Sequence, residues 1–123
     1  MIQDRQFNIE KIKLMADYGC YPLWWVSPEK VGNIDPKTLP LIQETIKRLD
    51  KWEEIYNATL NLQDPTNSPE VSTEAEAAFE EEGISLWKQL QTELAPNYQV
   101  VYFSELLGKV LTHPSELEVL PAI

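Results

Sequence analysis

The chain has few of the residues that build covalent or metal-centred sites. Its 123 residues include one cysteine, Cys20, and one histidine, His113. A single cysteine excludes an internal disulfide and a cysteine-cluster metal site. A zinc ion would need both residues and additional carboxylates as ligands. We therefore expect no metal ion and no bound cofactor.

Glycines and long apolar runs are also scarce. The four glycines lie far apart and form neither a phosphate-binding loop nor a dinucleotide fingerprint. The apolar runs are only a few residues long, as at Leu23–Val26, whereas a membrane-spanning helix needs about 20 residues. The N-terminus lacks the basic and apolar regions of a signal peptide. These absences predict a soluble protein of the cytoplasm.

Positive charge is in short supply. Lys and Arg number 10 against 20 Asp and Glu, which gives a formal net charge of -10. This balance weighs against a nucleic acid or an anionic membrane as partner. Residues 1–51 have a balance of +1 and residues 52–123 a balance of -11. The second half therefore carries the excess negative charge and is suited to a basic protein partner.

No catalytic arrangement stands out. Cys20 or a serine could formally pair with His113, but no nucleophile-elbow pattern surrounds a serine. Cys20 lies between glycine and tyrosine, a setting typical of a small buried apolar residue. With twenty carboxylates in the chain, pairs of acids are unavoidable, so such pairs are no evidence for general acid–base catalysis. We predict that the protein is not an enzyme.

The chain does contain clear secondary-structure patterns within a single domain, residues 1–123. Apolar residues make up 43%, enough for one core. Alternation and β-rich composition predict strands at about 10–15, 21–26 and 98–103. Residues 27–40 contain three prolines together with Gly32, Asn33 and Asp35 and are expected to form an ordered loop. The tail after Leu106 is expected to hold a short helix or strand.

Two helices are predicted at about 39–62 and 73–94. The first has an apolar face made of Ile42, Ile46, Leu49, Trp52, Tyr56 and Leu60. The second begins with Thr73 and Glu76 in the spacing of a capping box, and Gly83 on its apolar stripe indicates close packing against the other helix or the sheet. The result is an α+β fold in the order β-β-α-α-β, with both helices on one face of a small sheet.

Acidic and aromatic residues are the candidates for binding a partner. Glu80, Glu81 and Glu82 form the strongest acidic run, which is either a solvated helix face or a surface for a basic partner. Trp24 and Trp25 must point to opposite faces of a strand, so one of them needs cover from a loop or a partner. Trp25 and Trp87 are therefore added to the candidate surface.

A polar pocket is the alternative site. Asp17, Tyr18, Trp24 and Asn33 lie near predicted turns and could converge on a small ligand. Asp17 and Asn33 could instead cap backbone groups at those turns, as could Asn61 and Asp64.

The sequence resembles a group of small, mostly uncharacterised bacterial proteins. The resemblance rests on Met15–Cys20 followed by Pro22–Trp24, on Gly32–Ile34, Pro36 and Leu39–Leu41, and on Thr59–Asn61 with Asp64–Pro65. It implies no reaction. In size and acidity the chain is also similar to immunity proteins that neutralise bacterial toxins.

Three functions follow from these observations. The first is a non-catalytic acidic module, monomeric or homodimeric, that binds a basic protein. In its specific form, the module is an immunity protein that neutralises a basic bacterial toxin. The second is a small enzyme or ligand-binding protein that uses the polar pocket. The third is a housekeeping domain whose acidity serves only solubility.

Overall fold

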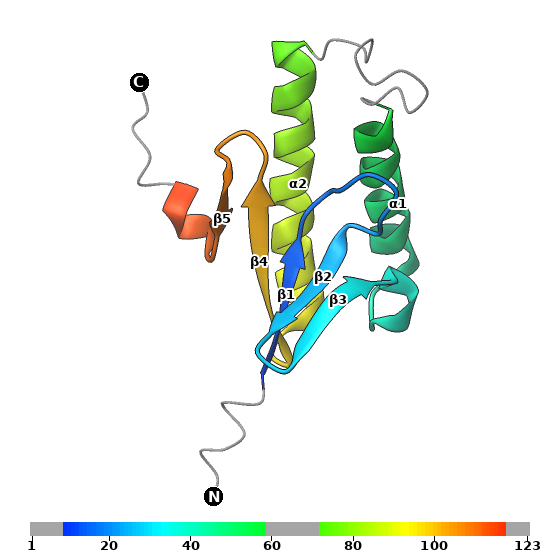
Figure 1. Ribbon diagram of the computed structural model, residues 1–123, viewed down its shortest axis with the longest axis vertical. Helices are drawn as coiled ribbons and strands as arrows, with labels where there is room; N and C mark the ends of the chain where they lie inside the picture. The colour runs from blue at the N-terminus through cyan, green and yellow to red at the C-terminus, as the bar shows by residue number, and fades with distance from the viewer. Residues whose placement is uncertain (1–8, 59–71, 118–123) are drawn as a thin grey trace, which may run out of the picture.

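A mixed sheet of five strands forms the centre of the computed structural model, which describes residues 9–58 and 72–117 (Figure 1). In spatial order the strands are β3 (Lys30–Ile34), β2 (Leu23–Ser27), β1 (Glu10–Leu14), β4 (Tyr98–Ser104) and β5 (Lys109–Leu111). The central pair, β1 and β4, is parallel, and all other pairs are antiparallel. The predicted α+β class is confirmed, with two more strands than expected.

Two helices cover one face of this sheet (Figure 1). They are α1 (Gln43–Asn57) and α2 (Thr73–Leu94), and the order along the chain is β-β-β-α-α-β-β. Short 3-10 turns, η2 (Pro36–Thr38) and η4 (Pro114–Leu117), precede α1 and follow β5. Most apolar side chains of the covered face are buried, among them Ile12 and Leu14 of β1, which alternate with residues of the other face.

The N-terminal ends of both helices differ from the prediction. Helix α1 begins at Gln43 rather than near residue 39, because its cap comes from α2. Glu93 accepts a hydrogen bond from the Ile42 backbone N–H at 2.9 Å and another from the Thr45 hydroxyl. A carboxylate at this position also complements the helix dipole. Ile42 is consequently outside the helix and 56% exposed, not part of its apolar face.

Helix α2 is capped one residue earlier than predicted. Ser72 is the N-cap, and its hydroxyl accepts a hydrogen bond from the Ala75 N–H at 3.1 Å. Thr73 is therefore the first helical residue, and the predicted capping box with Glu76 does not form. The predicted range 73–94 is confirmed, whereas residues 59–62, the predicted end of the first helix, lie outside the described residues.

Strand β3 lies in the segment expected to be a loop. Gly32 and Asn33 have low β propensity and obscured the pattern, but the turn after Ser27 places β3 antiparallel to β2. Three apolar residues, Val31, Ile34 and Leu39, were expected to anchor this segment to the core. Ile34 and Leu39 are buried, whereas Val31 is 79% exposed. The tail contains both a strand, β5, and the short turn η4.

Gly83 is the point of closest approach between α2 and its neighbours, as its position on the stripe predicted. A Cβ atom there would lie 2.5 Å from the Tyr102 hydroxyl and 2.9 Å from Trp52 Cζ2. These two side chains come from the sheet and from α1, and both are fully buried. Glycine is required because all three elements meet at this position.

Gly83→Ala is expected to destabilise the protein by about 1–2 kcal/mol. Overpacking costs about 1–3 kcal/mol and outweighs the helix-propensity gain of about 1 kcal/mol. Urea unfolding followed by tryptophan fluorescence measures the change. Ala78→Gly, at an exposed position of the same helix, calibrates the propensity contribution. A Gly83→Ala variant more stable than wild type would show that the contact is looser than described.

Candidate functional site

Two of the five predicted partner-binding residues are in the core. Glu80 is 7% exposed, and its two carboxylate oxygens accept hydrogen bonds from the Tyr102 hydroxyl at 2.8 Å and the Ser104 hydroxyl at 2.7 Å. Trp87 is 0% exposed, and its Nε1 donates to the Val100 carbonyl at 2.8 Å. Both residues join α2 to β4, so their function in this structure is to hold the helix on the sheet.

The other three residues reach the surface, but not together. Glu81 is exposed on the first half of α2, and Glu82 beside it is half-buried. Trp25 lies opposite Ile12 on the helix-covered face, with its ring 5.9 Å from that of Tyr98, just beyond the C-terminal end of α2. Glu81 and that end are separated by about 20 Å at the usual helical rise. Lys30 Nζ also lies 4.0 Å from the Trp25 ring centroid.

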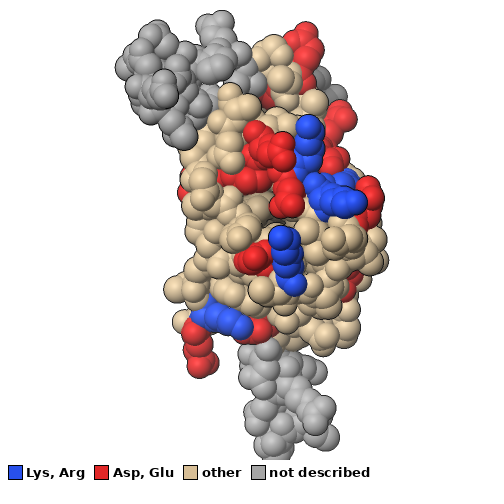
Figure 2. Space-filling model, turned by 90° about the vertical axis from the view of Figure 1, so that its right-hand side faces the viewer, with Lys and Arg blue, Asp and Glu red and all other residues tan. Residues whose placement is uncertain are grey.

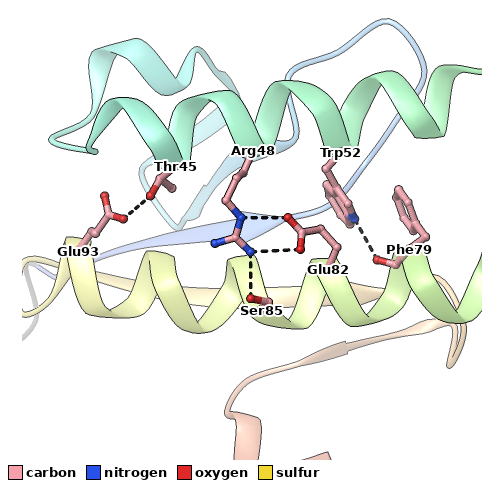
Figure 3. A network of polar contacts seen from close by, with 7 residues as sticks. All are labelled: Thr45, Arg48, Trp52, Phe79, Glu82, Ser85 and Glu93. Carbon is pink, nitrogen blue, oxygen red and sulfur yellow. Dashed lines mark hydrogen bonds and ion pairs between the residues drawn. The ribbon is translucent and has the colours of Figure 1, made fainter.

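Glu82 is engaged in a polar network between the two helices (Figure 3). Arg48 of α1 donates to both Glu82 oxygens, from Nε at 3.0 Å and from Nη2 at 3.2 Å, and to the Ser85 hydroxyl at 2.9 Å. The bidentate contact raises the pKa of Arg48. Since this pair connects α1 to α2, Glu82 has a structural role, and Glu81 is the exposed acid of the predicted run.

Asp17 and Asn33 bind backbone groups rather than forming the predicted pocket. Asp17 Oδ1 accepts from the Tyr18 N–H at 2.8 Å. The Asn33 amide accepts from the Tyr21 N–H at 2.9 Å and donates to the Tyr21 carbonyl at 2.7 Å. Trp24 Nε1 donates to the Met15 carbonyl at 2.9 Å. The capping alternative holds for Asp17 and Asn33, whereas Asn61 and Asp64 lie outside the described residues.

A cavity of about 570 Å³ does lie close to the predicted place, but mostly different residues line it. One wall is the loop between β1 and β2, and the other is the second half of α1. Asn33 is the one predicted pocket residue in the lining, which comprises Gly19, Cys20, Tyr21, Pro22, Asn33, Asp50, Glu53, Glu54 and Asn57. Three carboxylates from one helix therefore face this cavity.

Glu53 is the buried carboxylate of the cavity lining. Its side chain is 8% exposed, and neither carboxylate oxygen accepts a hydrogen bond. Burial, assisted by the negative charge of Asp17, raises the pKa of Glu53 to about 7. The Asp17 backbone and the Asn57 side chain favour the charged form, but neither is in hydrogen-bonding geometry with the carboxylate. A buried acid without a partner is costly unless something else satisfies it.

The sequence contained a signal for this residue. Glu53 follows Leu49 by four positions and precedes Tyr56 by three, so it occupies a place on the apolar stripe of α1. An acid at such a position is unusual, because carboxylates are rarely buried without a partner. Trp52, the preceding residue, fits the apolar spacing of the helix and conceals the acid beside it.

Charge is not segregated on the side of the molecule where α1 lies. Acidic and basic side chains are intermixed on the face that Figure 2 shows. The sequence-level division into a near-neutral half and an acidic half does not appear as a division of this face.

Over the residues that the structure describes, no three His, Cys, Asp or Glu side chains are grouped so that they could hold a metal ion. Neither described helix is long and apolar enough to cross a membrane. Cys20 is a half-buried free thiol whose Sγ lies 3.6 Å from the Tyr18 carbonyl.

Comparison with known proteins identifies the family. No curated protein matches the chain. The model of the family described as "Serratia CdiI immunity protein-like" matches residues 10–105, from the start of β1 to just past the end of β4. CdiI immunity proteins are non-catalytic and bind the toxin domain of a cognate CdiA protein, which confirms the prediction of a protein without enzymatic activity. The chain belongs to the Serratia CdiI immunity protein-like family.

Proposed function

We propose that this protein is an immunity protein that binds a basic CdiA toxin domain in the cytoplasm and neutralises it. The observation that carries the proposal is the family match over residues 10–105, which includes both helices and four of the five strands described. The matched region is thus the fold itself and not an isolated motif.

The charge of the chain supports a basic toxin as the partner. With a net charge of -10, the protein attracts a cationic domain over several ångströms at physiological ionic strength. Exposed acids on the first half of α2 are available for this contact, namely Glu74, Glu76 and Glu81. Complementary charge raises the association rate and favours the correct partner, and both properties suit an inhibitor that must act before the toxin does.

Glu81 is the member of the predicted surface that fits this role best. It is exposed and acidic, and it forms no ion pair within residues 9–58 and 72–117. Glu82 faces α1, where it pairs with Arg48, and its half-buried carboxylate lies at the edge of the surface that Glu81 forms. Trp25 lies at the other end of α2, so it belongs to this surface only if the toxin spans the length of the helix.

Co-production with a cognate CdiA toxin domain tests the proposal. Cells that make the toxin domain alone are expected to stop growing, and cells that also make this protein to grow. Calorimetric titration at low and high salt is expected to show an affinity that falls by about tenfold or more, because screening weakens exposed charge pairs.

Charge-reversed variants locate the surface. Glu81→Lys is expected to weaken binding several-fold more than Glu44→Lys, which makes the same change at an exposed position of α1. Failure to rescue growth would contradict the immunity function. Tight binding that is insensitive to salt would contradict a basic partner held by the acidic surface.

A further inference from the structure

The cavity between the β1–β2 loop and α1 has the composition of a cation-binding pocket. Asp50, Glu53, Glu54 and Asn57 recur at helical spacing, so their side chains share one face of α1 and all line the cavity. Its lining includes three carboxylates and neither lysine nor arginine. A volume of about 570 Å³ is ample for an extended side chain or a small organic molecule.

Glu53 supplies an independent indication of a ligand. Its side chain is more than nine-tenths buried, lines the cavity and has no hydrogen-bond partner for either oxygen. Buried polar groups are normally satisfied within the protein, and an exception calls for an explanation. Both oxygens are closed to solvent, so a donor that enters the cavity satisfies this carboxylate once the Glu53 side chain turns toward it.

The walls of the pocket are fixed before any ligand arrives. The Gly19 N–H donates to Asn57 Oδ1 at 3.0 Å, which ties the tip of the loop to α1. Gly19 has φ of +73°, a conformation that favours glycine at this contact. The Tyr18 and Tyr56 rings stack at 4.5 Å between the same two elements. A preorganised pocket avoids the entropy cost of ordering on binding.

The shape of the acid cluster favours an organic cation over a metal ion. Within the described part of the chain, the carboxylates are not grouped closely enough to coordinate a metal. An ammonium or guanidinium group on an aliphatic stem is larger, and its donors can reach carboxylates that are spread along a helix.

We propose that this pocket receives a lysine or arginine side chain of the bound toxin, with Glu53 as the buried acceptor and with Asp50 and Glu54 at the mouth. This inference rests on the proposed function for the identity of the partner. The pocket itself is defined by the chain alone, and a free cation of the same chemistry can test it.

Titration with agmatine, which carries a guanidinium group and an ammonium group on a short stem, tests the pocket directly. Amide NMR spectra at pH 8 are expected to show saturable shifts at Gly19, Cys20 and Asn57. Glu53→Gln is expected to weaken agmatine binding about tenfold, because the cation loses the negative charge of its hydrogen-bond acceptor. Glu44→Gln, an exposed acid of α1 outside the pocket, is the matched control and is expected to leave the affinity unchanged.

Binding of the toxin domain by the same variants shows whether the cation is a toxin side chain or a free small molecule. Glu53→Gln is expected to weaken its binding by about tenfold relative to Glu44→Gln. The pocket would be overturned if agmatine produced no saturable shifts. It would also be overturned if Glu53→Gln bound agmatine as tightly as the wild-type protein does. Agmatine binding together with toxin binding that ignores Glu53→Gln would overturn the assignment to a toxin side chain. Absence of toxin binding by the wild-type protein would refute the proposed function, while the agmatine result would stand by itself.

Discussion

Trp52→Ala is expected to lower the free energy of unfolding by about 3–5 kcal/mol, a large part of the total stability of a domain of this size. Trp52 is 1% exposed and lies between the two helices. Its ring stacks on Phe79 at 4.4 Å, and its Nε1 donates to the Phe79 carbonyl at 3.0 Å (Figure 3). Truncation removes the ring contact, loses this hydrogen bond and leaves a cavity beside Gly83.

Two further variants separate these contributions. Trp52→Phe keeps most of the apolar volume and loses the hydrogen bond, so its cost is expected to be smaller, about 1–3 kcal/mol. Trp24→Ala is the matched control, because Trp24 is half-buried on the opposite face of the sheet. Urea unfolding at pH 7 measures all three. An equal loss in Trp24→Ala and Trp52→Ala would contradict the central position assigned to Trp52.

Glu53→Gln is expected to stabilise the protein at pH 8 and to leave it unchanged near pH 4.5. The pKa of Glu53 is about 7 in the folded protein against a usual value of 4.5. Between these values the folded protein binds more protons than the unfolded chain, so its stability falls as the pH rises. A shift of this size corresponds to at most about 3 kcal/mol, and we expect about 1–2 kcal/mol because the cavity opens to solvent.

Denaturant unfolding at pH 4.5, 6 and 8 provides the measurement. The difference between wild type and Glu53→Gln should grow with pH, because glutamine carries no charge at any of these values. Glu54→Gln is the control, since Glu54 is the adjacent acid on α1 and is exposed. A wild-type protein that is less stable than Glu53→Gln by the same amount at all three pH values would show that Glu53 does not titrate in this range.

The elements with strong local patterns could be predicted from the sequence. Strand β1 was predicted from its alternation, β4 from its β-rich composition and helix α2 from its apolar spacing, and their bounds were predicted within a residue or two. Gly83 was also placed correctly, since a glycine on an apolar helical stripe has few explanations other than close packing. The compositional similarity to immunity proteins led to the same class as the family match.

Features that depend on contacts distant in sequence could not be predicted. The start of α1 depends on Glu93, 51 residues away from Ile42. Strand β3 forms because β2 offers it an edge, although Gly32 and Asn33 favour a turn. At the candidate site, the side chains of Glu80 and Trp87 were expected to be exposed because of their charge or size. Both are buried instead, because their polar atoms form hydrogen bonds with β4.

The parallel pairing of β1 with β4 determines when the protein can fold during its synthesis. This pair is the centre of the sheet, and its register joins Glu10 to Tyr98 and Leu14 to Tyr102. Contacts of such sequence separation form slowly and only after both segments are available. A ribosome must therefore release β4 before the sheet can close and before α2 has a surface to cover. The five-stranded sheet therefore forms only after β4 and β5 have emerged.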